Sequence, residues 1–165
     1  MTNLTWLEEY SGQTLDEILS LAGSHRVDSL ILAIEQAIGQ KAARLGEESL
    51  SSAERVVLAV EALEREVNNG GYSQFFTNTP AFVPTIVDSL LRIGCPRTAG
   101  ITGSAIGALH LQDLTEQNIE TAMAAEDDDI NDELSRCDQL YYQAGESIED
   151  QLFAFINANK DSITL

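Results

Sequence analysis

The sequence predicts an all-α protein, a single domain of about seven to eight helices over residues 1–165. Apolar residues recur at three- and four-residue spacing along most of the chain. Two capping boxes, Thr14-x-x-Glu17 and Ser51-x-x-Glu54, mark helix starts. No stretch between turn signals alternates apolar and polar residues, so we expect no strand. A hydrophobic fraction of 44% is sufficient for a core.

The first half of the chain predicts three helices. Thr14 opens a short one, and a second runs from Val27 to about Leu45 and stops at Gly46. A third begins after Ser51 and ends at Gly70-Gly71, because glycine readily takes the left-handed conformation that closes a helix. Their inward rows are Leu15, Ile18 and Leu19; Leu30, Ile31, Ile34 and Ile38; and Val56, Val60, Leu63 and Val67.

The second half predicts four or five more helices. Pro80 and Pro84 suit the start of a helix whose inward row is Ile86, Leu90 and Ile93. The next pattern, 97–111, contains three glycines, each costing a helix about 1 kcal/mol relative to alanine. We therefore expect a neighbouring helix to approach closely over Gly100, Gly103 and Gly107. Helices over about 115–125, 129–143 and 146–159 follow, the last two with the inward rows Ile130, Leu134, Cys137 and Tyr141, and Ile148, Leu152, Phe155 and Ile156.

The charge is strongly acidic, with 27 acidic and 9 basic residues and a net charge of −18. Residues 98–165 carry 14 acidic and 2 basic residues, a net charge of −12, and no basic residue lies between Arg97 and Arg136. Direct binding of DNA or RNA requires cations, and an anionic membrane would repel this chain, so we exclude both partners. Solubility, a basic protein partner and a metal cation stay open.

The helix pattern predicts where the densest acidic residues point. If the row from Ile130 to Tyr141 faces inward, Asp138 and the acidic residues around 128–132 face solvent, as do those of the last helix. This surface either keeps the protein soluble or presents carboxylates in place of DNA phosphates to a basic DNA-binding protein. The candidate partner-binding residues are Asp128, Asp129, Asp132, Glu133, Glu146, Glu149 and Asp150.

No residue pattern predicts a metal, a cofactor or catalysis. Asp127, Asp129, Asn131 and Asp138 match positions 1, 3, 5 and 12 of an EF-hand loop, but Asp132 stands where that loop needs glycine. The chain has no P-loop and no G-x-S-x-G elbow. His25 and His110 stand at helix ends, where capping is the simpler role. We expect a protein that is not an enzyme.

Three features that the sequence lacks predict the cellular compartment of the protein. The first basic residue is Arg26, so the N-terminus does not resemble a Sec signal peptide. The longest apolar run, residues 30–34, is too short to span a membrane. Cys95 and Cys137 have no ligand-like spacing, and we expect two buried free thiols. A cytoplasmic protein is the prediction.

The most distinctive stretch is EVNNGGYSQFFTNTP, residues 66–80. After the Gly70-Gly71 stop, Tyr72, Phe75 and Phe76 would form one aromatic face of a short helix. Gln74 and Asn78 could bond backbone groups freed by the turn. A structural corner is the favoured interpretation, and a ligand site contacted by Tyr72, Gln74 and Asn78 is the alternative.

This stretch resembles the E-V-x-N-G-G-[YF]-x-Q-F-F-x-N motif of a bacterial family of small acidic proteins of unknown function, whose characterised member is a DNA mimic. The motif residues are Glu66, Asn69, Gly70, Gly71, Tyr72, Gln74, Phe75, Phe76 and Asn78. The resemblance covers about residues 50–125.

The resemblance implies an all-helical fold, a homodimer as one option, and an acidic surface that occupies the DNA-binding face of a helix-turn-helix transcription factor. The acidic residues after 125 lie outside the motif, so their role does not carry over from it. The alternatives are an immunity-type protein that neutralises a basic toxin and a helical domain that binds a small ligand.

Overall fold

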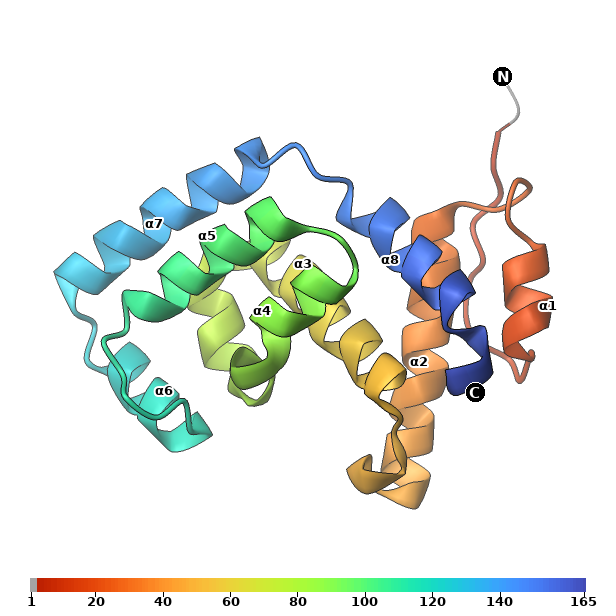
Figure 1. Ribbon diagram of the computed structural model, residues 1–165, viewed down its shortest axis with the longest axis horizontal. Coiled ribbons are helices and arrows are strands. Elements are labelled where there is room, and N and C mark those ends of the chain that lie inside the picture. The colour runs from red at the N-terminus through yellow and green to blue at the C-terminus, as the bar shows by residue number, and fades with distance from the viewer. Residues whose placement is uncertain (1–2) are drawn as a thin grey trace. The chain divides into compact units, whose positions relative to one another are not determined.

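The computed structural model describes residues 3–165, which form eight α-helices, three 3₁₀ turns and no strand (Figure 1). The all-α prediction is confirmed. The helices are α1 (Leu15–Ser20), α2 (Val27–Leu45), α3 (Ser52–Asn78), α4 (Val83–Arg92), α5 (Pro96–Gly107), α6 (Glu116–Ala124), α7 (Asp128–Gln143) and α8 (Ile148–Ala158). None of these helices combines the length and apolarity that a membrane crossing needs.

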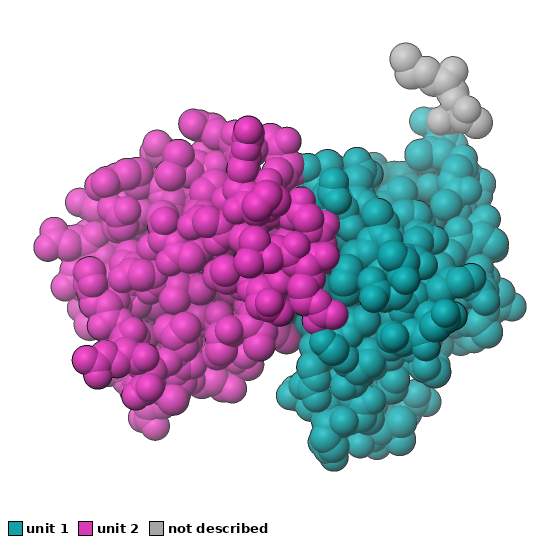
Figure 2. All heavy atoms as spheres, in the orientation of Figure 1, with its two compact units in different colours: residues 1–61, 147–165 teal, residues 62–146 magenta. Residues whose placement is uncertain are grey.

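The chain divides into two compact units, coloured separately in Figure 2. Unit 1 comprises residues 1–61 and 147–165, and unit 2 comprises residues 62–146. The boundary falls inside α3, so one helix contributes to both units.

Unit 1 contains both predicted capping boxes. The hydroxyl of Thr14 accepts from the Glu17 N–H, and the Glu17 carboxylate accepts from the Thr14 N–H at 2.7 Å. Ser51 and Glu54 form the same reciprocal pair at the start of α3. The predicted inward row of α2 is fully buried, and Gly46 ends that helix with φ 88°.

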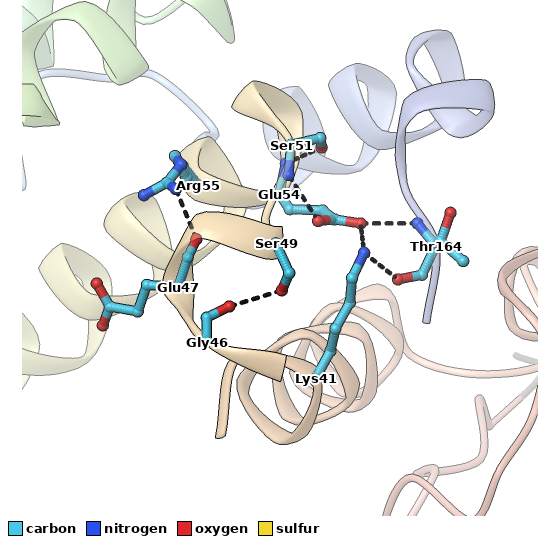
Figure 3. Close-up of polar contacts among 8 residues, drawn as sticks. All are labelled: Lys41, Gly46, Glu47, Ser49, Ser51, Glu54, Arg55 and Thr164. Carbon is cyan, nitrogen blue, oxygen red and sulfur yellow. Dashed lines mark hydrogen bonds and ion pairs between the residues drawn. The ribbon is translucent and has the colours of Figure 1, made fainter. Parts of the chain in front are cut away.

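Glu54 does more than cap α3. Its second carboxylate oxygen accepts from the Lys41 ammonium and from the Thr164 N–H, both at 2.8 Å (Figure 3). Lys41 also donates to the Thr164 carbonyl at 3.2 Å. Burial raises the pKa of Glu54, but the bonds from Lys41, Thr164 and Ser51 outweigh that cost and hold the pKa below its usual value. The fully buried Glu54 carboxylate thus links α2, α3 and the C-terminal segment by hydrogen bonds.

Unit 2 is built around the α4, α5 and α7 helices, and α5 packs against both of the others. The predicted rows Ile86, Leu90 and Ile93 of the α4 region and Leu134, Cys137 and Tyr141 of α7 are buried, whereas Ile130 is only half-buried. Cys95 and Cys137 are free and buried, as predicted. Burial, with the charges of Glu146 and Glu64, raises the pKa of Cys95 to about 11.

The predicted close helix approach over the α5 glycines is wrong. A Cβ added at Gly100, Gly103 or Gly107 would meet nothing within 4 Å. Gly100 and Gly107 are exposed, and Gly103 is half-exposed. The three glycines therefore leave a strip of α5 backbone without side chains and without a covering neighbour in the part of the chain that the structure describes.

Candidate functional site

The acidic segment begins at the N-terminus of α7, where Asp127 is the capping residue. One oxygen of its carboxylate accepts from the N–H groups of Asp129 and Ile130, at 2.9 and 3.0 Å. Asp128 and Asp129 follow in the first turn, where the helix dipole favours negative charge. The local fold therefore tolerates three consecutive aspartates at this position.

The helical period sorts the α7 carboxylates into two rows. Asp128 and Asp132 lie on the face opposite the buried row, and both are exposed. Asp129 and Glu133 lie on the flank towards α5, where they line a cavity beside that helix. These four residues are named the α7 acidic surface below.

One cation lies on the α7 acidic surface. Arg136 pairs with Glu133 at 3.0 Å, and their side chains are 67% and 40% exposed. Exposed pairs of this kind contribute about 0–1 kcal/mol, because water screens them and two long side chains must be ordered. The surface therefore keeps a strong net negative charge.

Glu146 does not point to solvent, contrary to the prediction. Its carboxylate accepts from the N–H groups of Arg97 and Thr98 and from the Thr98 hydroxyl, each at 2.8 Å. Burial raises the pKa of Glu146, but these bonds outweigh it and lower the pKa below its usual value. Glu146 is thus a cap for the N-terminus of α5, with both oxygens engaged.

Glu149 and Asp150 are exposed in the first turn of α8, in unit 1. The Ser147 hydroxyl donates to Asp150 at 2.8 Å. Partial burial and the neighbouring charges of Asp28 and Asp150 raise the pKa of Glu149. The two residues are accessible as predicted, but they belong to a different unit from the α7 acidic surface.

The Gly70-Gly71 corner breaks α3 as predicted. Gly71 has φ 75° and ψ −174°, a conformation accessible almost solely to glycine, and the helix resumes at Tyr72. Asp138 supplies the cap: its carboxylate accepts from the Tyr72 N–H at 2.7 Å. The expectation that Asp138 faces solvent is therefore wrong. Burial raises its pKa, and the Tyr72 bond offsets part of that rise.

The aromatic residues of the corner form the core of unit 2. Tyr72, Phe75 and Phe76 are fully buried. The Tyr72 ring meets the Tyr141 ring edge-on, with centroids 5.9 Å apart, and its hydroxyl pairs with the Thr102 hydroxyl at 2.8 Å. The corner thereby joins α3, α5 and α7.

Glu66 links the two halves of α3, before and after the Gly70-Gly71 break. Its carboxylate accepts from the side-chain amides of Gln74 and Asn78, each at 2.8 Å. The prediction that these amides bond freed backbone groups is wrong, because both are used by Glu66. Tyr72 is also paired internally, so each of the three side chains proposed for a ligand site makes a hydrogen bond within the protein. Asn69 is exposed beside the break.

The structure also rules out the EF-hand alternative. Asp127 caps α7, and Asp129 and Asn131 lie within that helix, so no loop surrounds a cation. The Asp138 carboxylate accepts a hydrogen bond from the Tyr72 N–H. Residues 3–165 contain no group of three or more His, Cys, Asp or Glu side chains placed to hold a metal ion. His25 contacts the Ser24 hydroxyl through Nδ1 at 2.9 Å, and His110 is exposed with φ 52°.

These features define a small, acidic, all-helical protein with a carboxylate-rich helix on one unit. The chain belongs to the DMP19-like protein family, whose model matches residues 48–159. The match extends past the 50–125 stretch that the motif suggested and includes α7 and α8. This is not a known enzyme family. No curated protein matches the chain.

Sequence reasoning missed the internal partners of Glu66, Asp138 and Glu146. Asp138 accepts from Tyr72, 66 positions earlier in the chain, and Glu146 accepts from Arg97 and Thr98, 49 and 48 positions earlier. No local sequence pattern indicates such distant pairs. For Asp138 and Glu146 the available signal is the helix start that each one caps, at Tyr72 after the Gly70-Gly71 break and at the N-terminus of α5, because the free N–H groups there need acceptors.

Proposed function

We propose that the chain is a cytoplasmic protein that mimics DNA. Its acidic surface binds the DNA-binding face of a basic protein, a helix-turn-helix transcription factor, and blocks that protein from DNA without catalysing a reaction. Membership of the DMP19-like family supports this proposal, because the family name is associated with DNA mimicry.

The observation that carries the proposal is the charge density of the α7 acidic surface. Its four carboxylates fall within residues 128–133. At 1.5 Å per residue they span roughly 7.5 Å of helix axis, so successive charges lie on average about 2.5 Å apart along it. B-DNA presents one phosphate charge per roughly 1.7 Å of its axis. A basic face shaped for phosphates would therefore meet on α7 a linear charge density about two-thirds of that of B-DNA.

Solubility alone accounts less well for this arrangement. Like charges four residues apart on a helix, such as Asp128 with Asp132 and Asp129 with Glu133, destabilise the helix by a few tenths of a kcal/mol per pair. Interspersed lysines would give solubility without this cost. A basic partner relieves the repulsion only when it is bound, which favours a surface made for binding.

The test compares two charge reversals of equal size. Asp128→Lys with Asp132→Lys alters the α7 acidic surface, and Glu116→Lys with Glu120→Lys makes the same change on exposed residues of α6. The probes are purified helix-turn-helix transcription factors from the source genome, titrated at low and physiological salt. We expect the α7 variant to bind about 100-fold more weakly and the α6 variant to bind nearly as wild type, with the wild-type affinity falling as salt rises.

Equal effects of the two variants would contradict a specific α7 surface. Capture of a basic nuclease in place of a transcription factor would assign the same surface to an immunity-type protein. Glu149 and Asp150 belong to the proposed partner-binding set and are tested by the same reversal in unit 1. Glu146 is left out of that test, because its loss would uncap α5.

A further inference from the structure

A groove runs between α5 and α7 within unit 2. It consists of two cavities of about 470 Å³ each, and Ser104 lines both. At one end Gly107 of α5 faces Asp129 and Glu133 of α7. At the other end Gly100 faces Leu140 and Ala144, so the two helices border the groove in antiparallel directions, side by side in Figure 1.

The floor of the groove is unusually bare. Gly100 and Gly107 line it, and each leaves open space where a side chain would stand. Each glycine costs α5 about 1 kcal/mol relative to alanine, and no internal packing in residues 3–165 makes use of the gap. Bare backbone lets an incoming helix come nearer than the usual 8–10 Å between helix axes.

The groove has two chemically different ends. One end is acidic, with Asp127, Asp129 and Glu133. The other end is mainly apolar, with Ile101, Ala144 and Leu140, and Leu140 is 46% exposed. Arg97 also lines the apolar end, where its guanidinium donates to the Ala144 carbonyl at 3.4 Å. An occupant that matches both ends carries cations at one end and aliphatic groups at the other.

We propose that the groove seats one helix of the partner. That helix places Arg or Lys side chains against Asp129 and Glu133 and aliphatic side chains against Leu140, with its backbone over the glycines of α5. The 12 residues of α5 extend over roughly 18 Å, so about three turns of the partner helix are seated. This inference rests on the proposed function and specifies how the partner is held beside the outward Asp128–Asp132 row.

The experiment fills the groove without changing charge. Ser104→Leu places a bulky side chain in both cavities, and Ser135→Leu makes the same change at an exposed α7 residue that lines neither. The first probe is a fluorescein-labelled, alanine-based helical peptide of about five turns, with arginines at one end and leucines at the other end of a single face. A second peptide has the same composition with these residues spread around the helix.

We expect Ser104→Leu to weaken binding of the one-faced peptide at least about tenfold, a loss of about 1.4 kcal/mol, and Ser135→Leu to leave it unchanged. Gly100→Leu serves as a second filling variant, and circular dichroism confirms that each variant is folded. Equal binding by wild type and both filling variants, or equal binding of the two peptides, would overturn the proposal.

Binding of the transcription factor identified in the charge-reversal experiment distinguishes the proposed groove from the proposed DNA mimicry. If the factor binds Ser104→Leu as tightly as wild type but binds Asp128→Lys with Asp132→Lys about 100-fold more weakly, the groove does not hold a partner helix and mimicry stands. If every variant binds it equally, both proposals fail.

Discussion

The sharpest structural prediction concerns one substitution made at two glycines. Gly71→Ala puts a side chain at φ 75°, in the turn that precedes Tyr72. The new Cβ would lie 2.3 Å from a carboxylate oxygen of Asp138, the cap of the Tyr72 N–H. Gly103→Ala makes the same chemical change in α5, where nothing lies within 4 Å of the added atom.

The two changes should have opposite signs. At Gly71, backbone strain costs roughly 1–3 kcal/mol. Asp138 can swing away from the new methyl group, but it then gives up a hydrogen bond to a charged acceptor, worth about 1.5–3 kcal/mol. We therefore expect Gly71→Ala to lower the free energy of unfolding by roughly 3–5 kcal/mol. Gly103→Ala should raise it by up to about 1 kcal/mol, because alanine favours the helix and has room.

Urea unfolding followed by circular dichroism measures both values. Three of the four tyrosines lie in unit 2, and the single tryptophan, Trp6, lies in unit 1, so the two near-ultraviolet signals report on different units. The loss in Gly71→Ala should appear in the tyrosine signal.

A double-mutant cycle with Asp138→Ala separates strain from the lost cap. Gly71→Ala should cost less in the Asp138→Ala background by about the 1.5–3 kcal/mol assigned to the bond. Changes of equal sign and size at Gly71 and Gly103 would refute the description of the corner.

Three further predictions follow from the buried polar groups. Glu66→Ala should cost about 1–2 kcal/mol in urea unfolding, because it removes a carboxylate that accepts from the amides of Gln74 and Asn78, whereas the exposed Glu120→Ala should cost under about 0.5 kcal/mol. The Cys95 thiol, with a pKa of about 11, should react with a thiol reagent at pH 8 only on unfolding; rapid reaction of the folded protein would contradict its burial. Stability, measured as melting temperature, should rise as the pH falls from neutral towards the ordinary carboxylate pKa values of 4.5 and 3.8 and should fall below them; a steady loss from pH 7 downward would contradict this profile.

The pH profile follows from two sets of carboxylates. Burial raises the pKa of Asp138, and partial burial with the charges of Asp28 and Asp150 raises the pKa of Glu149, so the folded state takes up protons first and gains stability as the pH falls. Hydrogen bonds outweigh burial and lower the pKa values of Glu54 and Glu66. Their stabilisation is complete above the ordinary value of 4.5 and is lost as the pH falls through their lower folded values. Relief of the −18 charge adds to the first gain.

The helices could be predicted from sequence because their signals are local. The row Leu30, Ile31, Ile34 and Ile38 specifies a buried face, and Thr14 with Glu17 specifies a helix start, without reference to any other element. The Gly70-Gly71 break was predictable for the same reason.

The predictions that were wrong depend on which element packs beside each helix. Three glycines in α5 specify a bare face, but only the placement of α7 decides whether that face is packed or open. Likewise, the period of α7 places Asp138 on a flank but cannot reveal that the Tyr72 N–H lies there. The candidate site was therefore predicted as a charged helix, while its groove and the internal role of Glu146 required the structure.

In the proposed function, the α7 acidic surface and DNA compete for one face of a basic protein. The direct measurement is a titration of the identified transcription factor, bound to fluorescein-labelled operator DNA, with this chain, followed by fluorescence anisotropy. We predict complete release of the DNA, an apparent affinity that weakens in proportion to the operator concentration, and release by Asp128→Lys with Asp132→Lys only at about 100-fold higher protein concentration. A ternary complex in which the factor holds the operator and this chain together would contradict the claim.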